Sequence, residues 1–319
     1  MNKRFNLSAN IENGFPLDAQ YIVTPNGRRA TQSIINDFKS GIHSFTIIGT
    51  YGTGKSSFLL ALEADLNRDN KTKRLLNPQN LSETDDFEIL NIVGDYMELS
   101  ALLGRKLNID GHSQSILDEL KKYYNHLKEQ NKFLLIVIDE FGKVLEHAAK
   151  NNPEQELYFL QKFAEFVNVP FRDILLLTTL HQNFGAYAKN LTETQKNEWT
   201  KVKGRFKEIT FVEPIEQLLF LASQQMHDKK SQKEENKTAK QLYHLAVDTK
   251  FVSKSFSEDA AQQLYPLDSF SAYAITSAIQ RYGQNERSLF SFLAARGSNS
   301  LSEFQTKTNL TYNLACVYD

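Results

Sequence analysis

The sequence has a single cysteine, Cys316, among its 319 residues, so no disulfide can form within the chain. Such a chain is typical of a reducing compartment. No stretch reaches the roughly 18 apolar residues that a membrane helix needs. No apolar run follows Lys3 and Arg4, as it would in a signal peptide. We therefore expect a soluble, cytoplasmic protein that has no membrane partner.

An excess of charge is also missing. Lys and Arg number 37 and Asp and Glu number 38, so the formal net charge is −1. A protein that grips nucleic acid over a whole face is usually more basic, so any contact with DNA has to be local or shared among subunits. Hydrophobic residues make up 41% of the chain, which is enough for one large α/β domain and a smaller companion.

Five short apolar runs, rich in Ile, Val, Leu and Phe, predict buried strands. Segments with helical periodicity, such as Ser113–Gln130 and Glu154–Val167, lie between them. Strand–helix alternation favours a five-stranded parallel sheet that is covered by helices on both faces, a three-layer αβα sandwich. The predicted strands lie near His43–Ile48, Phe87–Val93, Phe133–Asp139, Asp173–Leu180 and Glu208–Val212.

After Pro214 the strand signals stop, and helical periodicity predicts a small all-helical domain. Two polar stretches, Asn67–Asp86 and the lysine-rich His227–Lys240, predict a surface insertion and a solvated loop. An apolar segment ends at Asp319, and from it we expect the native chain to continue. The predicted helices are Ile215–Met226, Thr238–Asp248, Ala272–Arg281 and Arg287–Ala295. The divisions are an N-terminal segment (1–40), an α/β domain (41–213), a helical domain (214–296) and a C-terminal tail (297–319).

Residues 49–56 fit the pattern G-x-x-x-x-G-K-[ST], between a predicted strand and a helical segment. Glycines let consecutive amides face a phosphate at the N-terminus of a helix. Lys55 would reach the β- and γ-phosphates, and Ser56 would bind Mg²⁺. The alternative is a glycine-rich turn with an exposed lysine. It does not explain why a predicted strand precedes this turn and a helix follows it. The predicted phosphate-binding residues are Gly49, Thr50, Tyr51, Gly52, Thr53, Gly54, Lys55, Ser56 and Ser57.

The third apolar run, Phe133–Ile138, ends in two carboxylates, Asp139 and Glu140. Such a strand delivers its carboxyl end to the crevice where parallel sheets bind ligands. There Asp139 would hold Mg²⁺ and Glu140 would take a proton from the attacking water. The alternative is that the two carboxylates only solvate the end of a strand. The P-loop pattern at residues 49–56 makes this alternative the weaker one. The two motifs together predict a P-loop NTPase fold and hydrolysis as well as binding.

Three motifs that would indicate other nucleotide-binding classes are absent. The segment Asn70–Lys73 lacks the aspartate of the guanine-reading N-K-x-D motif. Neither an LSGGQ signature of transporter ATPases nor the H-R-D and D-F-G pair of kinases occurs in the sequence. By elimination, ATP is the expected nucleotide.

The order of these motifs resembles the AAA+ ATPases, and in particular their origin-recognition and STAND-type branches. In this order a P-loop precedes an Asp-Glu strand, a polar-tipped fourth strand, an arginine before a fifth strand, and a helical lid. Several segments also resemble large ATPases of bacterial anti-phage operons, including BREX-type systems. These segments are Ile48–Leu59, Ile138–Lys143, Trp199–Phe206 and Gly283–Phe290.

The resemblance implies further roles. Thr179 or His181 would sense the γ-phosphate, although His181 could equally be an ordinary loop histidine. Arg205 would be an arginine finger, which acts across a subunit interface, or else a member of an intramolecular ion pair. Arg287 would be the lid arginine that touches the γ-phosphate, or a plain surface arginine. The segment that begins with Tyr21 and Ile22 would wrap the adenine, or simply pack.

The expected cofactors are therefore ATP and Mg²⁺, and the expected activity is ATP hydrolysis to ADP and phosphate. The resemblance favours a homo-oligomeric motor or remodelling module, with DNA or a defence-system protein as its partner. A nucleotide-operated switch with slow turnover is the alternative. A scaffold with structural ATP is disfavoured by the intact Asp139–Glu140 pair and by Arg205.

Overall fold

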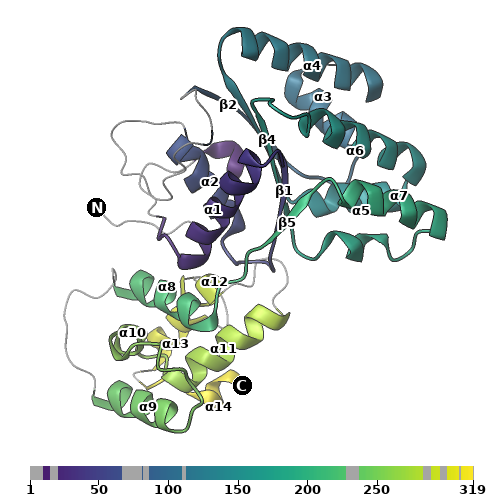
Figure 1. The fold of residues 1–319 in the computed structure, drawn as a ribbon. Coiled ribbons are helices and arrows are strands. Elements are labelled where there is room, and N and C mark those ends of the chain that lie inside the picture. The colour runs from purple at the N-terminus through teal and green to yellow at the C-terminus, as the bar shows by residue number, and fades with distance from the viewer. Residues whose placement is uncertain are drawn as a thin grey trace.

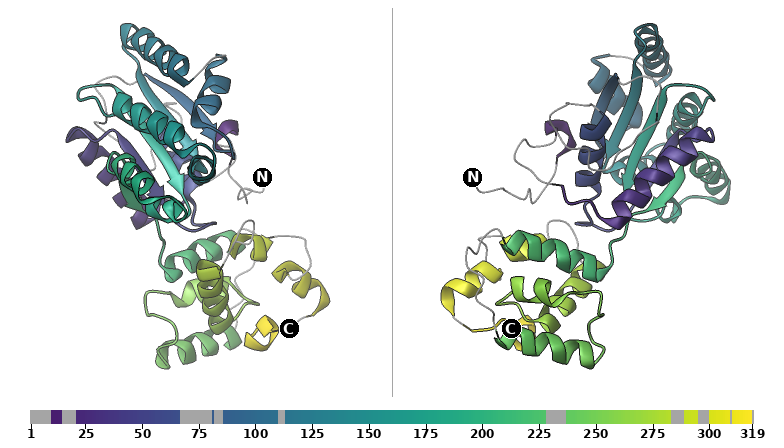
Figure 2. Two further views of the ribbon diagram at one scale, coloured as in Figure 1. Left: turned by 90° about the vertical axis from the view of Figure 1, so that its right-hand side faces the viewer. Right: turned by 60° about the vertical axis from the view of Figure 1, so that its left-hand side comes forward.

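The computed structural model describes residues 10–14, 21–66, 81, 86–109, 113–227, 237–282, 289–294, 300–308 and 310–318. An α/β part that contains the sheet and an all-helical part form two distinct lobes (Figures 1 and 2). The described residues from η1 to β5 occupy one lobe, and the helices α8 to α14 form the other. The helical character of the part after the sheet agrees with the loss of strand signals after Pro214.

A single parallel sheet of five strands, in the order β2-β3-β4-β1-β5, forms the centre of the α/β part. The middle strands are completely buried, which explains their continuous apolar sequence. Each strand lies within about two residues of its predicted position. The five-stranded parallel sheet is thereby confirmed. The strands are β1 (Ser44–Ile48), β2 (Phe87–Val93), β3 (Phe133–Asp139), β4 (Ile174–Leu180) and β5 (Lys207–Thr210).

Helices cover both faces of this sheet, and successive side chains of one strand serve opposite cores. In β3, Leu134, Ile136 and Ile138 pack on one side, whereas Leu135 and Val137 pack on the other. Complete burial of each such side chain stabilises the fold by roughly 1.5–3 kcal/mol. One face carries η1 (Ile11–Asn13), α1 (Pro25–Lys39) and α2 (Lys55–Leu66), and the other carries α3 (Leu99–Leu107), α4 (Ser113–Glu129), α5 (Phe141–Lys150), α6 (Pro153–Val167), η2 (Phe184–Ala188) and α7 (Glu193–Lys203) (Figure 1).

The helical part has its own apolar core, which includes Leu219, Leu264 and Leu301. Its C-terminal segment joins this core, and the Asp268 amide donates to the Tyr312 carbonyl at 3.1 Å. Most of the predicted polar insertion and lysine-rich loop, at 67–80, 82–85 and 228–236, lies outside the described residues. The helices are α8 (Ile215–His227), α9 (Lys237–Asp248), α10 (Glu258–Gln263), α11 (Ser269–Tyr282), α12 (Leu289–Ala294), α13 (Leu301–Lys307) and α14 (Leu314–Tyr318).

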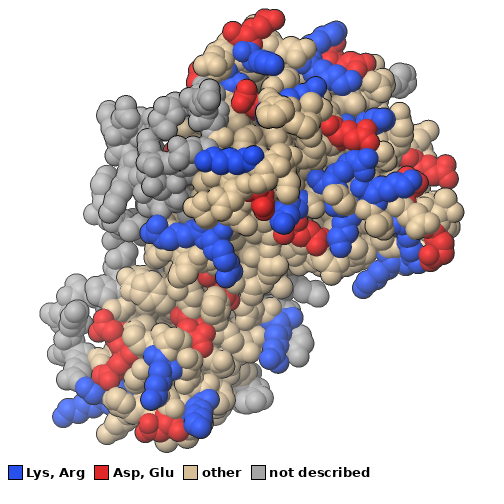
Figure 3. Space-filling view, viewed as in Figure 1, with Lys and Arg blue, Asp and Glu red and all other residues tan. Residues whose placement is uncertain are grey.

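Charged side chains of both signs are interspersed over the surface in Figure 3. Many of them are paired within one helix, as Lys122 is with Glu119 at 2.6 Å. Of the helices in the described part, none combines the length and the apolar character that a membrane crossing requires.

The buried carboxyl group of Glu156, in α6, makes the stability of the fold depend on pH. Its residue is 6% exposed. Burial, and then the nearby Glu98 carboxylate, raise the pKa of Glu156 from 4.5 to about 7, while a hydrogen bond with the Leu99 backbone opposes the rise. The folded protein therefore binds this proton more tightly than the unfolded chain does. The stabilising contribution is complete below pH 4.5 and is lost as the pH rises through about 7.

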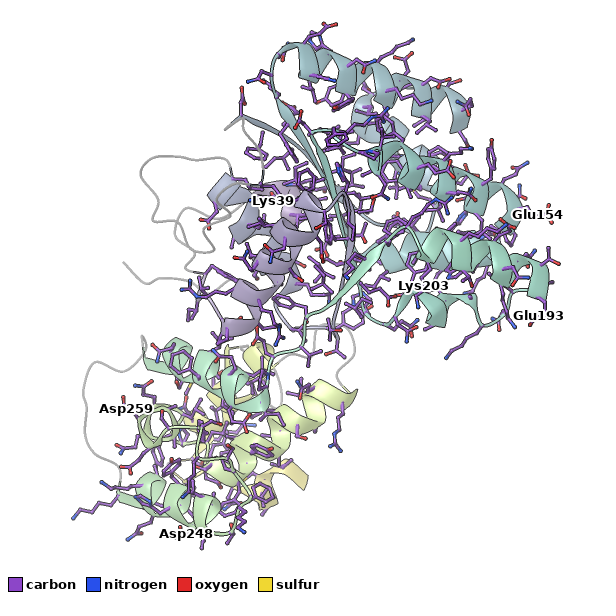
Figure 4. All side chains as sticks on the ribbon, viewed as in Figure 1. Lys39, Glu154, Glu193, Lys203, Asp248 and Asp259 are labelled. Atoms are coloured by element: carbon purple, nitrogen blue, oxygen red, sulfur yellow. The ribbon has the colours of Figure 1, made fainter. Side chains whose placement is uncertain are left out.

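Glu156→Gln is therefore expected to raise the free energy of unfolding at pH 8 by about 1–3 kcal/mol, and by much less at pH 5. Urea unfolding at the two pH values measures the difference. Glu154→Gln is the matched control, because Glu154 is an exposed residue at the start of the same helix (Figure 4). Equal stabilisation by Glu156→Gln at both pH values would contradict the assignment.

Candidate active site

The loop that joins β1 to α2, at residues 49–54, has the backbone of a phosphate-binding turn, and we refer to it as the phosphate loop. Gly52 and Gly54 have φ values of 72° and 86°, which other residues adopt only with strain. A Cβ atom added at Gly49 would lie 2.2 Å from the Phe211 carbonyl oxygen, so the chain passes β5 at a distance that only glycine allows. The turn leads directly into the N-terminus of the buried helix α2, where amide groups are free to bind an anion.

Lys55, the first residue of α2, is folded back over this turn. Its Nζ donates to the carbonyl oxygens of Gly49 at 2.6 Å and of Thr50 at 2.9 Å. Burial lowers the pKa of Lys55 to about 8, although the Asp139 and Glu140 carboxylates oppose the shift. A phosphate group would favour the charged ammonium, so this lysine is placed to gain from an anionic ligand.

Ser56 and Asp139 lie side by side at the carboxyl edge of the sheet. The Ser56 hydroxyl donates to Asp139 Oδ2 at 2.6 Å. Hydroxyl and carboxylate oxygens are ligands that Mg²⁺ accepts, usually together with phosphate oxygens and water. Among the described residues, no group of three or more His, Cys, Asp and Glu side chains is placed to hold a metal ion. The pair thus fits Mg²⁺ that is delivered with a nucleotide.

Glu140 follows Asp139 in an unusual backbone conformation. Its φ is 53°, in the left-handed region, where a residue other than glycine is strained. The Glu140 amide donates to Asp139 Oδ1 at 3.0 Å and to the Thr179 hydroxyl at 2.9 Å, and these bonds hold the turn. Its side chain forms an ion pair with Lys143. The sequence motifs did not indicate a role for Lys143; its spacing of three residues from Glu140, at the start of a helix, was the available signal.

The two candidate sensors at the tip of β4 have different surroundings. Thr179 is fully buried and donates to Asp139 Oδ1 at 2.5 Å, so it orients the acidic pair. His181 stacks on Tyr51 of the phosphate loop, with ring centroids 3.5 Å apart. Burial, and then the Lys55 charge, lower the pKa of His181 to about 4, so the imidazole is neutral near pH 7. Which of the two contacts a phosphate stays a prediction.

Arg205 lies away from this cluster. It precedes β5, which runs parallel to β1, and the phosphate loop follows the other end of β1. Its guanidinium pairs with Glu165 of α6 at 2.7 Å and also donates to the Lys201 carbonyl at 2.7 Å. Figure 4 labels Lys203, the last residue of α7, which lies two positions before Arg205 in the sequence. In this chain Arg205 therefore forms the intramolecular ion pair that was the alternative to a finger. Arg287 lies outside the described residues.

The segment before α1 runs beside the start of the helical part. Tyr21 packs partly buried against the core of α1 and α2, and burial together with the nearby Glu213 raises its pKa. Ile22 is half-buried. The Thr24 hydroxyl, which caps α1, donates to Glu213 Oε1 at 2.5 Å. Contact of Tyr21 and Ile22 with adenine stays a prediction.

The helical part closes directly over the phosphate loop. The Gln280 side chain of α11 donates to the Glu213 carbonyl, which follows β5, at 2.8 Å. Residues of the loop and of the helical part together line one small cavity. The residues that line this cavity are Thr50, Tyr51, Gly52 and Thr53 from the loop and Leu218, Thr276, Ile279, Gln280 and Leu289 from the helical part.

The parallel sheet thus carries the glycine turn and the Asp139–Glu140 pair side by side at its carboxyl edge. The fold is that of the P-loop NTPases. Lys55, Ser56, Asp139, Glu140 and Thr179 lie together at the carboxyl edge of the sheet.

No family model and no curated protein sequence matches the chain. Among solved structures, the ORC2 protein of Aeropyrum pernix in its ADPNP–ADP complexes is 16% identical, with 80% of this chain and 70% of that chain covered and a TM-score of 0.45. Drosophila ORC bound to DNA is 15% identical, with 83% and 62% covered and a TM-score of 0.42. C. elegans PCH-2 is 14% identical, with 82% and 61% covered and a TM-score of 0.38. Likenesses at this level do not carry function from one protein to another.

Proposed function

We propose that the chain is an AAA+ ATPase module, which binds ATP with Mg²⁺ in the phosphate loop and hydrolyses it to ADP and phosphate. The hydrogen bond between Ser56 and Asp139, 2.6 Å long, supports this most strongly. It joins residues 83 positions apart, and Lys55, the residue before Ser56, is buried beside the same carboxylate. A glycine turn, a cation and a carboxylate–hydroxyl pair that lie next to one another are the parts that phosphoryl transfer needs.

The chemistry follows from the placement of each group. The loop amides and Lys55 would hold the phosphates, and Ser56 with Asp139 would hold Mg²⁺, which offsets charge on the phosphate oxygens when bound. The water oxygen forms a bond to the γ-phosphorus while the bond from that phosphorus to the bridging oxygen of ADP breaks. The water proton passes to Glu140, a step that contributes roughly 10²–10⁴-fold.

Release of inorganic phosphate from purified protein tests the proposal. Turnover is expected with ATP and Mg²⁺, and it should disappear when EDTA removes the metal. GTP in a parallel assay tests the preference that was inferred by elimination. Absence of ATP binding and of turnover, in protein shown to be folded by circular dichroism, would overturn the proposal.

We further propose that the module works as an oligomer in which Arg205 completes the site of a neighbouring copy. Arg205 is only 29% exposed in its side chain and is held by Glu165, so this role requires the ion pair to open at an interface. An arginine that reaches the site of a neighbouring copy raises the rate of nucleotide hydrolysis roughly 10³–10⁵-fold.

A mixing experiment distinguishes this role from a structural ion pair. Arg205→Ala should bind ATP normally but hydrolyse it at least 100-fold more slowly. Adding Lys55→Ala protein, which lacks a working site but supplies Arg205, should restore turnover. Glu165→Gln should retain activity. If Arg205→Ala is fully active, or if the mixture stays inactive, Arg205 acts within its own chain only.

A motor or remodelling role is the proposed output, because the helical part contacts the phosphate loop directly and would move with the state of the nucleotide. Mass photometry with ATP, with ADP and with neither, repeated with DNA, tests it. A motor predicts a ring or filament and turnover stimulated by its partner. Slow basal turnover with a nucleotide-dependent oligomeric state would favour a switch. A place in anti-phage defence is proposed from the resemblance of the quoted segments alone.

A further inference from the structure

Lys143 is bound to the carboxylate that would act as the general base. It lies in the first turn of α5, and its Nζ is 2.5 Å from Glu140 Oε2. The Lys143 amide also donates to the Glu140 carbonyl oxygen at 3.1 Å, so the backbone and the side chain of the same residue both hold Glu140. The other carboxylate oxygen of Glu140 makes no ion pair among the described residues.

The backbone of Glu140 is held by its neighbours, whereas its side chain is free to change orientation. Its amide donates to both Asp139 and Thr179, and its φ of 53° is set by that turn. The side chain of Glu140 is 36% exposed and is therefore not fixed by packing. The interaction with Lys143 is what holds this carboxylate in one orientation.

The charges of the cleft explain why such a contact is needed. The nucleotide brings several negative charges to a place that already holds Asp139 and Glu140. Repulsion would turn the Glu140 carboxylate toward solvent, away from the phosphates. Lys143 is charged in the physiological range like any exposed lysine, and its hydrogen bond with Glu140 raises its pKa further. Its ammonium offsets this repulsion locally.

We propose that Lys143 is a positioning residue for ATP hydrolysis, which holds the Glu140 carboxylate by one oxygen and leaves the other free to accept the proton of the attacking water. The inference rests on the proposed ATPase function. Lys143 would act through Glu140 and not on the phosphates themselves, and this distinction can be tested.

The test is a double-mutant cycle on the full chain. Lys143→Met should lower kcat about 10-fold while the Kd for the slowly hydrolysed analogue ATPγS, measured by calorimetry, changes less than 3-fold. Lys143→Arg, which can still pair with a carboxylate, should recover most of the rate. In a Glu140→Gln background, adding Lys143→Met should lower the residual rate no further, because its target is already gone. Lys122→Met is the matched control, since Lys122 makes the same type of three-residue ion pair, with Glu119, on α4.

Each other outcome overturns the inference. A further loss of rate in the Glu140→Gln background, or a large rise in the Kd for ATPγS, would mean that Lys143 binds the phosphates directly. A faster Lys143→Met enzyme would mean that the pair restrains Glu140 instead of positioning it. An unchanged rate would remove Lys143 from the mechanism. In all three cases the wild type still hydrolyses ATP, so the proposed function would stand. The proposed function fails only if the wild type itself shows no turnover.

Discussion

Lys55→Ala is expected to weaken ATP binding at least about 30-fold, a rise in Kd that calorimetry measures. The Lys55 ammonium is buried and faces the phosphate loop, where it donates to the carbonyl oxygens of Gly49 and Thr50. Loss of one partner from such a desolvated charge interaction costs about 2–5 kcal/mol, which corresponds to roughly 30- to 5,000-fold in Kd.

A matched control separates this loss from a general loss of positive charge. Lys132→Ala also removes a lysine, but Lys132 lies 3.8 Å from Glu88 beside the start of β3, at the opposite end of the strand from the acidic pair. It should bind ATP as the wild type does. Unchanged affinity in Lys55→Ala would disprove the phosphate-binding role of the loop.

Glu140→Gln is expected to keep ATP binding and to lower the rate of hydrolysis by about 10²–10⁴-fold. Glutamine has the same shape but cannot take up a proton near neutral pH, and the backbone bonds of residue 140 to Asp139 and Thr179 do not involve its side chain. The variant should therefore trap ATP. Single-turnover analysis of bound nucleotide, quenched at intervals, measures the trapped fraction.

Asp95→Asn is a suitable control for that experiment, because Asp95 contributes to the field around Lys143 without being bonded to Glu140. It should retain hydrolysis within a few-fold. Complete single-turnover hydrolysis by Glu140→Gln would remove Glu140 as the base, even if the rest of the site is correct.

The sheet could be predicted closely from the sequence because burial determines it. The strands β3 and β4 are apolar along almost their whole length, and parallel strands buried on both faces require this. The single tryptophan, Trp199, is likewise in the core, since it is 1% exposed and its indole donates to the Phe184 carbonyl at 3.0 Å. The turn at residues 49–54 could be predicted because its backbone geometry requires glycine at positions 49, 52 and 54.

The contacts around the acidic pair could not be predicted in the same way. The stacking of Tyr51 on His181 depends on how two loops approach each other, and no local pattern encodes that distance. The partner of Arg205 is Glu165, 40 positions earlier, which becomes a neighbour only when α6 and α7 pack together. The Lys143–Glu140 pair was visible as a spacing, but not as part of the site, because many lysines make such pairs on exposed helices.

The proposal that Lys55, Ser56 and Asp139 form one nucleotide site is tested most directly by a crystal structure of the protein grown with ADPNP and Mg²⁺. We expect the triphosphate to lie in the turn at residues 49–54, with Lys55 on its phosphates and the metal ion beside the Ser56 hydroxyl. A nucleotide bound anywhere else, or a turn that stays empty at saturating ADPNP, would contradict the account.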